Sequence, residues 1–335
     1  QASASGQNMR KRQSPKRKPL KKKEQVQEPT VEIQPIEYET QAIEETANVL
    51  FKPNPGPQTD FLAAAEREVL YGGSAGGGKS YAMLSDPLRY MGHPAFSGLL
   101  LRHTTEELRE LVFKSQELYP KIWPGIKWSE RKMQWTAPSG ARLWMSYLDR
   151  DDDVLRYQGL AFSWIGFDEL TQWATPYAWN YMRSRLRSTA ADLPIYMRAT
   201  TNPGGRGHHW VKKMFIDPAP YNRAYDATDI ETGEVLRYPA GHAKAGRPLY
   251  KRRFIPARLS DNPYLAESGD YEAMLLSMPE QQRRQLLDGD WDIKEGAAFT
   301  EFDRNIHVIE PFDIPSNWVK FRACDYGYGS KSGVV

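Results

Sequence analysis

Cysteine is nearly absent from the sequence, since Cys324 is the only one among 335 residues. A single thiol excludes an internal disulfide, and with it the class of small proteins that disulfides hold together. The sequence also lacks a run of about 18 apolar residues and a basic leader followed by an apolar stretch. We therefore expect a soluble, intracellular protein with no membrane partner.

Acidic residues are missing from positions 10–23, RKRQSPKRKPLKKK, which hold nine Lys and Arg residues. The reverse is true of residues 24–45, where seven glutamates occur without a Lys or Arg. Because those nine positive charges lie in one run, the formal net charge of +3 becomes −6 for the remaining residues. Few core-forming residues and strong charge are typical of disorder, so we expect residues 1–45 to be a disordered tail. The basic run could bind nucleic acid or an acidic partner, or be only a solvated tail.

The rest of the chain alternates between strand and helix patterns. A helix is expected from Lys79, another over TEELRELVFKSQELYPKI (105–122), and a hairpin around Pro138-Ser139-Gly140. Short apolar runs predict buried strands at REVLY (67–71), SGLLLRHT (97–104), FSWIGFDEL (162–170) and PIYMRATTNP (194–203). This alternation predicts an α/β fold with a mostly parallel sheet and helices on both faces.

The second half of the chain gives weaker signals. Residues 205–265 are rich in Gly, Pro and basic residues and predict little beyond loops. A helical pattern follows from about Glu267 to Leu287, and new strand patterns begin near Ala297. We expect a first domain over 46–265, a helical linker over 266–296, and an incomplete further domain over 297–335.

Five glycines stand between Gly72 and Gly78, where a predicted strand gives way to a predicted helix. The stretch fits the pattern G-x-x-x-x-G-K-[ST], in which backbone N–H groups wrap a phosphate chain and side chains would block its approach. Lys79 would reach the β- and γ-phosphates of ATP, and Ser80 would bind Mg²⁺. A flexible glycine-rich linker is the alternative. The residues expected to bind the nucleotide are Gly73, Ser74, Ala75, Gly76, Gly77, Gly78, Lys79, Ser80 and Tyr81.

Two acids end the apolar stretch WIGFDE. Asp168 would hold the Mg²⁺ shell beside the glycine loop, and Glu169 would polarise the attacking water. The alternative is that both acids only favour the start of a helix. The chain contains no Asn-Lys-x-Asp element of the kind that reads guanine in a GTPase, so we expect ATP to be the nucleotide.

Four motifs in this order, PGPQTDFLAAAEREVLYGGSAGGGKS, LRYQGLAFSWIGFDEL, ATTNP and CDYGYG, resemble the large subunit of tailed-bacteriophage terminases. The resemblance covers residues 53–335. It implies an N-terminal P-loop ATPase of the additional-strand, catalytic-glutamate type and a C-terminal RNase H-like nuclease. It also implies a motor that moves double-stranded viral DNA into a prohead as a homo-oligomeric ring, with the portal protein and the small terminase subunit as partners, in the host cell cytoplasm.

The same resemblance implies roles for single residues. Gln58 is similar to an adenine-reading glutamine, although it could be an ordinary turn residue. Thr200, Thr201 and Asn202 are similar to a coupling motif that senses the γ-phosphate, although they could only cap a turn. Arg156 is similar to an arginine finger supplied to a neighbouring subunit, and Arg183, Arg185 and Arg187 compete with it for that role.

Asp325 is similar to the first metal-binding acid of the nuclease, whose site holds two Mg²⁺ or Mn²⁺ ions and needs several carboxylates. No further matching acids follow within the sequence, so we expect the chain to end inside the nuclease domain. Asp303 and Glu301 do not match the motif.

Other signals are weak. His208 and His209 lack further metal ligands at a suitable spacing, so we expect a loop pair. The basic residues between Arg247 and Arg258 could contact DNA or merely solvate a loop. Two alternative functions stay open: a single-strand helicase or recombination-type ATPase, and a scaffold in which ATP only orders a complex.

Overall fold

The computed structural model describes residues 51–219 and 221–293, together with residues 315, 317, 318, 324–325 and 333–334. Contacts divide the chain into two units, Gln1–Asn48 and Val49–Val335, and every described residue belongs to the second. The predicted disordered tail therefore lies outside the described residues, and it remains a prediction.

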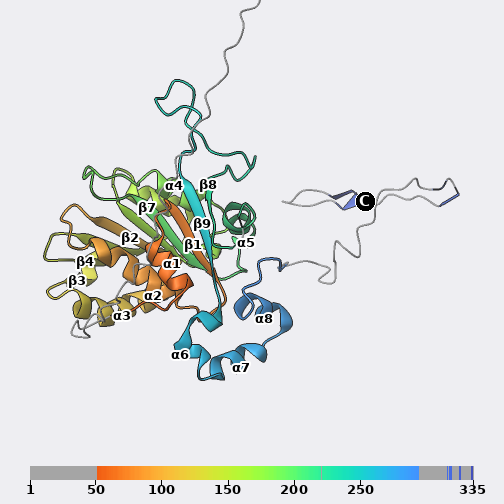
Figure 1. Ribbon diagram of the computed structural model, residues 1–335, viewed down its shortest axis with the longest axis horizontal. Helices are drawn as coiled ribbons and strands as arrows, with labels where there is room; N and C mark the ends of the chain where they lie inside the picture. Colours follow the sequence, from red (N-terminus) through yellow and green to blue (C-terminus); the bar gives the residue numbers. More distant parts are fainter. Residues whose placement is uncertain are drawn as a thin grey trace, which may run out of the picture. The chain divides into compact units, whose positions relative to one another are not determined.

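A nine-stranded sheet forms the centre of the described part (Figure 1). Six neighbouring strands run parallel, and the strands at either side of them add antiparallel pairs. The prediction of a mostly parallel sheet is confirmed. In order across the sheet the strands are β3 (Lys127–Ser129), β4 (Gln134–Thr136), β5 (Arg142–Tyr147), β2 (Ser97–Arg102), β6 (Trp164–Asp168), β7 (Tyr196–Thr201), β1 (Glu68–Gly73), β9 (Lys251–Ala257) and β8 (Ala224–Asp226).

The order of the central strands matters for function. β7 lies between β1, which leads into the glycine loop, and β6, which ends in Asp168. Because β2, β6, β7 and β1 are parallel, their carboxyl ends meet at one edge of the sheet. Parallel α/β sheets bind ligands at this edge. β7, which lies between β1 and β6, is the additional strand of the fold that the resemblance implied.

Both faces of the sheet are buried, as alternate side chains of one strand show. Along β1, Val69 and Tyr71 join the hydrophobic cluster on one face, and Leu70 joins the cluster on the other. The first face is covered by α1 (Pro57–Ala63), α2 (Lys79–Ser85) and α3 (Thr105–Ile122), and the second by α4 (Tyr177–Arg183), α5 (His208–Val211) and the π-helical turn Lys212–Ile216 (Figure 1). A short 3₁₀ helix, Asp86–Tyr90, extends α2.

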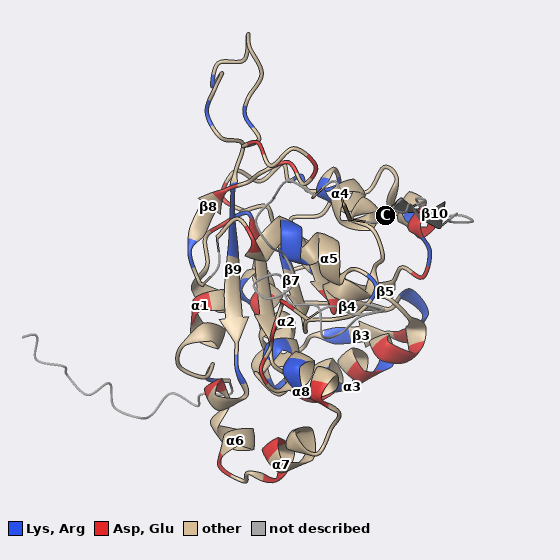
Figure 2. Ribbon diagram, turned by 90° about the vertical axis from the view of Figure 1, so that its right-hand side faces the viewer, with Lys and Arg blue, Asp and Glu red and all other residues tan. Residues whose placement is uncertain are grey.

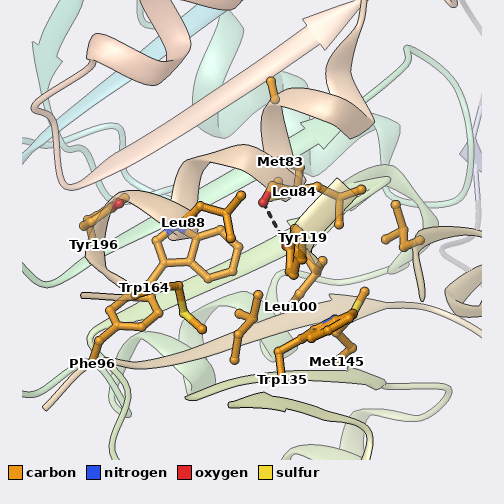
Figure 3. Close-up of a cluster of buried hydrophobic side chains, with 14 of the residues drawn as sticks. Met83, Leu84, Leu88, Phe96, Leu100, Tyr119, Trp135, Met145, Trp164 and Tyr196 are labelled. Carbon is orange, nitrogen blue, oxygen red and sulfur yellow. Dashed lines mark hydrogen bonds between the residues drawn. The ribbon is translucent and has the colours of Figure 1, made fainter. Parts of the chain in front are cut away.

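Large side chains fill the first cluster, and two of them donate hydrogen bonds inside it (Figure 3). Tyr119 of α3 donates its hydroxyl hydrogen to the carbonyl of Leu84, 2.8 Å away. Trp164 of β6 donates its indole N–H to Asp86 at 2.8 Å. Each buried side chain of this size stabilises the fold by about 1.5–3 kcal/mol, so this cluster holds α2 and α3 firmly against the strands.

α3 shows why the sequence prediction worked best for long periodic segments. Thr104 accepts a hydrogen bond from the backbone N–H of Glu107, whose side chain in turn accepts one from Thr104, and this capping box begins the helix. Its buried residues Leu108, Leu111, Val112, Ser115 and Tyr119 recur at helical spacing. The helix therefore begins and ends at the residues expected from the sequence.

β9 is the main correction to the sequence analysis, which expected loops over residues 205–265. The strand begins Lys-Arg-Arg and contains Pro256, so charge and proline hide its apolar pattern. Arg252 is buried and pairs with Glu68 of β1 at 2.7 Å, while Arg253 donates to Asn222 at 2.8 Å. Both readings of the basic stretch, as a DNA contact or a solvated loop, are therefore wrong for Arg252. Figure 2 shows the blue segment along β9.

The helical pattern near the end of the described part divides into short helices. α6 (Pro263–Ala266), α7 (Asp270–Leu276) and α8 (Glu280–Leu286) follow one another, and Pro279 lies directly before α8. Beyond residue 293, only a pair of two-residue strands is described as regular structure: β10 (Cys324–Asp325) and β11 (Gly333–Val334), which pair antiparallel. Nearly all of the predicted nuclease region lies outside the described residues, so that domain stays a prediction.

Candidate nucleotide site

The glycine loop follows β1 and leads into α2, as predicted. At two glycines of this loop, any other residue would strain the backbone and crowd a neighbouring atom. At Gly73 φ is +141°, and an added Cβ would lie 2.2 Å from the carbonyl oxygen of Ala257. At Gly78 φ is +76°, and an added Cβ would lie 2.7 Å from the side-chain nitrogen of Gln58. The loop therefore packs against two other segments through bare backbone, which a flexible linker would not do.

Backbone hydrogen bonds hold the start of the loop against the segments that follow it in sequence. The N–H of Ser74 donates to the carbonyl of Ala257, at the end of β9, at 2.8 Å. The N–H of Ala75 donates to the carbonyl of Leu286, in α8, at 2.7 Å. The predicted linker helices thus contact the nucleotide loop directly.

Two further residues support the loop, and sequence reasoning missed both. Asn262 donates its side-chain amide to the carbonyl of Gly76 at 2.6 Å, and Tyr71 donates its hydroxyl hydrogen to the carbonyl of Gly77 at 2.7 Å. Tyr71 lies on β1 next to the glycines, so its place was visible in the sequence but its role was not. Asn262 lies 186 residues from Gly76 in the sequence, and only the fold brings it to the loop.

Lys79 begins α2 and is buried. Its ammonium donates to the carbonyl of Ser74 across the loop. Burial lowers the pKa of Lys79, and the nearby charges of Glu169 and Asp168 oppose that effect. Ser80 follows in the first turn of the helix and is half-buried, whereas Tyr81 is exposed, with Lys114 over its ring.

Asp168 ends β6 at the same edge of the sheet, with only 1% of its surface exposed. One carboxylate oxygen accepts a hydrogen bond from Thr200 of β7. The other lies 2.9 Å from Nε of Arg102, at the end of β2. A buried carboxylate requires such partners, and here the two neighbouring strands supply them.

Glu169 turns the chain out of β6 in the left-handed conformation, with φ of +59°. Its carboxylate accepts hydrogen bonds from the backbone N–H of Asn202 at 3.3 Å and from the hydroxyl of Thr201 at 3.4 Å. Burial and the charge of Asp168 raise the pKa of Glu169, while Lys79 and Arg102 oppose the rise. The strained backbone and the raised pKa are both features of a carboxylate arranged for proton transfer.

The end of β7 joins the two acids. Thr200 contacts Asp168, while Thr201 and the backbone of Asn202 contact Glu169. Thr201 also shares a hydrogen bond of 2.7 Å with the hydroxyl of Thr171, which follows Glu169 by two residues. The structure thus places the three residues of the predicted coupling motif against the two acids, and it adds Thr171, which the sequence analysis missed.

Gln58 lies beside the loop rather than in an ordinary turn. It is buried in α1, where its side-chain oxygen accepts from the N–H of Asn54 at 2.6 Å and its nitrogen donates to the carbonyl of Gly78 at 2.9 Å. The amide links α1 to the nucleotide loop. Its predicted role in reading adenine requires at least one of these bonds to exchange for the base.

The candidate arginine fingers have different surroundings. Arg156 is exposed and lies over the ring of Tyr147, with a hydrogen bond of 2.8 Å to that residue's carbonyl. Arg183 instead pairs with the buried Glu68, at the opposite edge of the sheet from the acids. Arg185 lies over the ring of Tyr181, and Arg187 donates to the carbonyls of Gly159 and Leu160.

Comparison with a family model identifies the protein family of this chain. The model of the N-terminal part of the terminase large subunit, T4likevirus-type, matches residues 70–306, which include the glycine loop, both acids and β7. The chain belongs to the terminase large subunit family. No curated protein sequence matches it.

Two solved structures of one large terminase share the fold. The large terminase of a thermophilic bacteriophage, in complex with ADP, is 17% identical; the match covers 82% of this chain and 62% of that one, with a TM-score of 0.52. A second crystal structure of the same phage protein gives 18% identity, the same coverage and a TM-score of 0.51. The ATPase domain of the large terminase from a Thermus phage is 14% identical over 72% of this chain and 94% of that domain, with a TM-score of 0.45. This terminase chain spans less than two thirds of the length of the ADP-bound terminase.

The terminase site offers hard oxygen ligands rather than a preformed metal cage. Among the described residues, no three His, Cys, Asp or Glu side chains are grouped so that they could hold a metal ion. Mg²⁺ commonly binds through one or two protein oxygens plus the phosphates of its nucleotide, and Asp168 and Ser80 fit that donor set. His208 and His209 begin α5 instead of forming a loop pair, and His208 stacks on Trp291.

No helix in the described ranges is both long and apolar enough to cross a membrane.

Proposed function

We propose that this terminase chain is an ATPase whose turnover drives double-stranded viral DNA into a prohead. The observation that carries the proposal is the position of Glu169, which lies beside Asp168, within the electrostatic reach of Lys79, and is hydrogen-bonded to the end of β7. A carboxylate in this setting can remove a proton from water next to a bound phosphate chain.

The side chains divide the work among them. Backbone N–H groups of residues 73–80, other than those of Ser74 and Ala75, cradle the phosphates, and Lys79 neutralises the β- and γ-phosphates. Ser80 and Asp168 would hold Mg²⁺, which would shield the negative charge of the phosphates when it is bound. Glu169 accepts the proton of the attacking water on its carboxylate. Its raised pKa brings this group closer to the pH at which a general base works best.

β7 connects hydrolysis to movement in this proposal. Because Thr200 bonds to Asp168 and Thr201 bonds to Glu169, a change at either carboxylate alters the hydrogen bonds at the end of one strand. Asn202, whose side-chain oxygen is buried without a hydrogen-bond partner, lies at the same point. The amide oxygen can only accept a hydrogen bond, as from water, so the amide nitrogen is the group that would donate to the γ-phosphate.

The wider machine extends the proposal beyond the described residues. We infer a homo-oligomeric ring in the host cell cytoplasm, with the portal protein and the small terminase subunit as partners and Arg156 as the finger of a neighbouring subunit. In the whole protein, a C-terminal RNase H-like nuclease would use Asp325 and two Mg²⁺ or Mn²⁺ ions. The second candidate, a single-strand helicase or recombination-type ATPase, uses the same nucleotide site, but family membership favours the terminase.

An ATPase assay with and without DNA tests the proposal. The chain should hydrolyse ATP with Mg²⁺, and double-stranded DNA together with the small subunit should stimulate it more than single-stranded DNA does. Lys79→Ala serves as the control that removes the phosphate-binding charge. Stimulation by single strands alone would favour the helicase, and the absence of Lys79-dependent hydrolysis would contradict the proposal.

A further inference from the structure

Arg102 is a charged residue of the site that no motif in the sequence points to. It ends β2, whose preceding residue Leu101 pairs with Phe167 of β6, so Arg102 reaches the same edge as Asp168. The side chain is buried, with 8% of the residue exposed, and its Nε lies 2.9 Å from the carboxylate of Asp168. A buried arginine at the end of an otherwise apolar strand requires a charged partner, and here that partner is the predicted Mg²⁺ ligand.

The charges at this edge come in two pairs. Asp168 and Glu169 supply the negative charges, and Lys79 and Arg102 supply the positive ones. Asp168 pairs with Arg102, whereas the ammonium of Lys79 donates to the carbonyl of Ser74 within the glycine loop. Lys79 therefore remains with the loop that is to hold phosphate, although two carboxylates lie near enough to attract it.

We propose that Arg102 is a positioning residue of the nucleotide site, which occupies Asp168 and thereby keeps Lys79 free for the phosphates. This inference deepens the proposed function and rests on it. Without Arg102, the nearest cation to the buried carboxylates is Lys79. The lysine would then be drawn from the loop toward Asp168, and the nucleotide would lose its main charged contact.

Equilibrium binding of ADP in EDTA tests this directly, because it needs neither hydrolysis nor metal. Arg102→Gln should weaken ADP binding about tenfold, which corresponds to about 1.4 kcal/mol. Arg102→Lys keeps the charge and should recover most of the affinity. Arg109→Gln, an exposed arginine in α3, is the matched control and should bind as the wild type does.

A double variant separates a role through Asp168 from simple damage to the fold. If Arg102 acts by occupying Asp168, then Asp168→Asn removes the need for it, so adding Arg102→Gln to Asp168→Asn should weaken ADP binding no further. Thermal melting of each variant confirms that it is folded. If Arg102→Gln alone does not fold, the comparison of Arg102→Lys with the wild type, and of the double variant with Asp168→Asn, still decides the question.

The binding assay distinguishes failure of the Arg102 role from failure of the proposed function. A wild-type chain that binds no nucleotide contradicts the proposed function itself. A wild type that binds ADP, together with an Arg102→Gln variant that binds within about twofold of it, overturns only the role of Arg102. Additive losses in the double variant would overturn it as well.

Discussion

Two glutamates at opposite edges of the same sheet have opposite electrostatic surroundings. Glu68 begins β1 and is fully buried, with Arg252 at 2.7 Å and Arg183 as a second ion-pair partner. Burial opposes its ionisation, but the charges of Arg252 and Arg183 and their hydrogen bonds hold the pKa of Glu68 below its ordinary value. The cluster joins β1 to β9 and α4, and every charge in it has a partner from the same chain.

The negative charge of Glu169, at the other edge of the sheet, is only partly offset by nearby cations. Burial and Asp168 raise its pKa, and Lys79 and Arg102 offset only part of the rise. Its partners from β7 are a backbone N–H and a hydroxyl rather than a guanidinium. A buried acid with two arginines stabilises a fold, whereas a buried acid with a neighbouring acid is prepared to accept a proton.

The largest expected effect concerns Arg156, the cation that we propose a neighbouring subunit supplies to the nucleotide site. Glu68 obtains both arginines within its own chain, whereas we expect Arg156 to act on a neighbouring subunit. An arginine finger accelerates hydrolysis by about 10³–10⁵-fold, so Arg156→Ala should reduce turnover on that scale. Specific ATPase activity should also rise with protein concentration.

Mixing two inactive variants isolates this role. Arg156→Ala and Glu169→Gln together should recover part of the turnover, because one type of interface then holds an intact finger and an intact glutamate. Recovery is measured as ATPase rate against mixing ratio, with each variant alone as the control. An assembled ring that shows no recovery at any ratio would count against Arg156.

The next effect is on stability. Glu68→Gln leaves the buried Arg252 and the half-buried Arg183 without their anion, and breaking a buried ion pair in this way costs about 3–5 kcal/mol. Chemical denaturation should show a fall of that size in the free energy of unfolding. Glu117→Gln, at an exposed position of α3, should change it by less than about 0.5 kcal/mol. A Glu68→Gln variant as stable as the wild type would show that the cluster is not structural.

The pH dependence of stability in the wild type and in Glu68→Gln gives a further test of the ion pairs of Glu68. Because the folded pKa of Glu68 lies below its unfolded value of about 4.5, its stabilisation is fully present above that pH and is lost as the pH falls through the lowered folded pKa. The stability difference between wild type and Glu68→Gln should therefore be largest near neutral pH and shrink below pH 4.5. Denaturation curves between pH 3 and 7 measure it. A difference that stays constant over this range would contradict the lowered pKa.

The smallest effect is expected at the glycine loop. Tyr71→Phe removes the hydrogen bond to the carbonyl of Gly77 and should reduce the unfolding free energy by about 0.5–1.5 kcal/mol. Tyr119→Phe removes a comparable buried bond to Leu84, remote from the site, and serves as its control. Only the Tyr71 variant should also change nucleotide affinity, and equal affinities would show that this bond does not shape the loop.

The sequence predicted those elements whose signal lies within a few neighbouring residues. The strand before the glycines, α3 and the acids at the end of β6 each carry their signal within a few residues, and the structure confirms these elements. The pairing of Asp168 with Arg102, the support of Gly76 by Asn262 and the strand β9 depend on contacts between distant segments. In β9 the buried Arg252 looks like surface charge until Glu68 is placed opposite it.

The most direct test of the central claim compares Glu169→Gln with the wild type in one set of assays. Turnover should fall about a hundredfold or more, because the amide cannot accept the proton of the attacking water. Binding of ATP should survive, and the unfolding free energy should not fall, since the ionised carboxylate with its raised pKa is already disfavoured by burial. A Glu169→Gln variant that hydrolyses ATP at the wild-type rate would contradict the account.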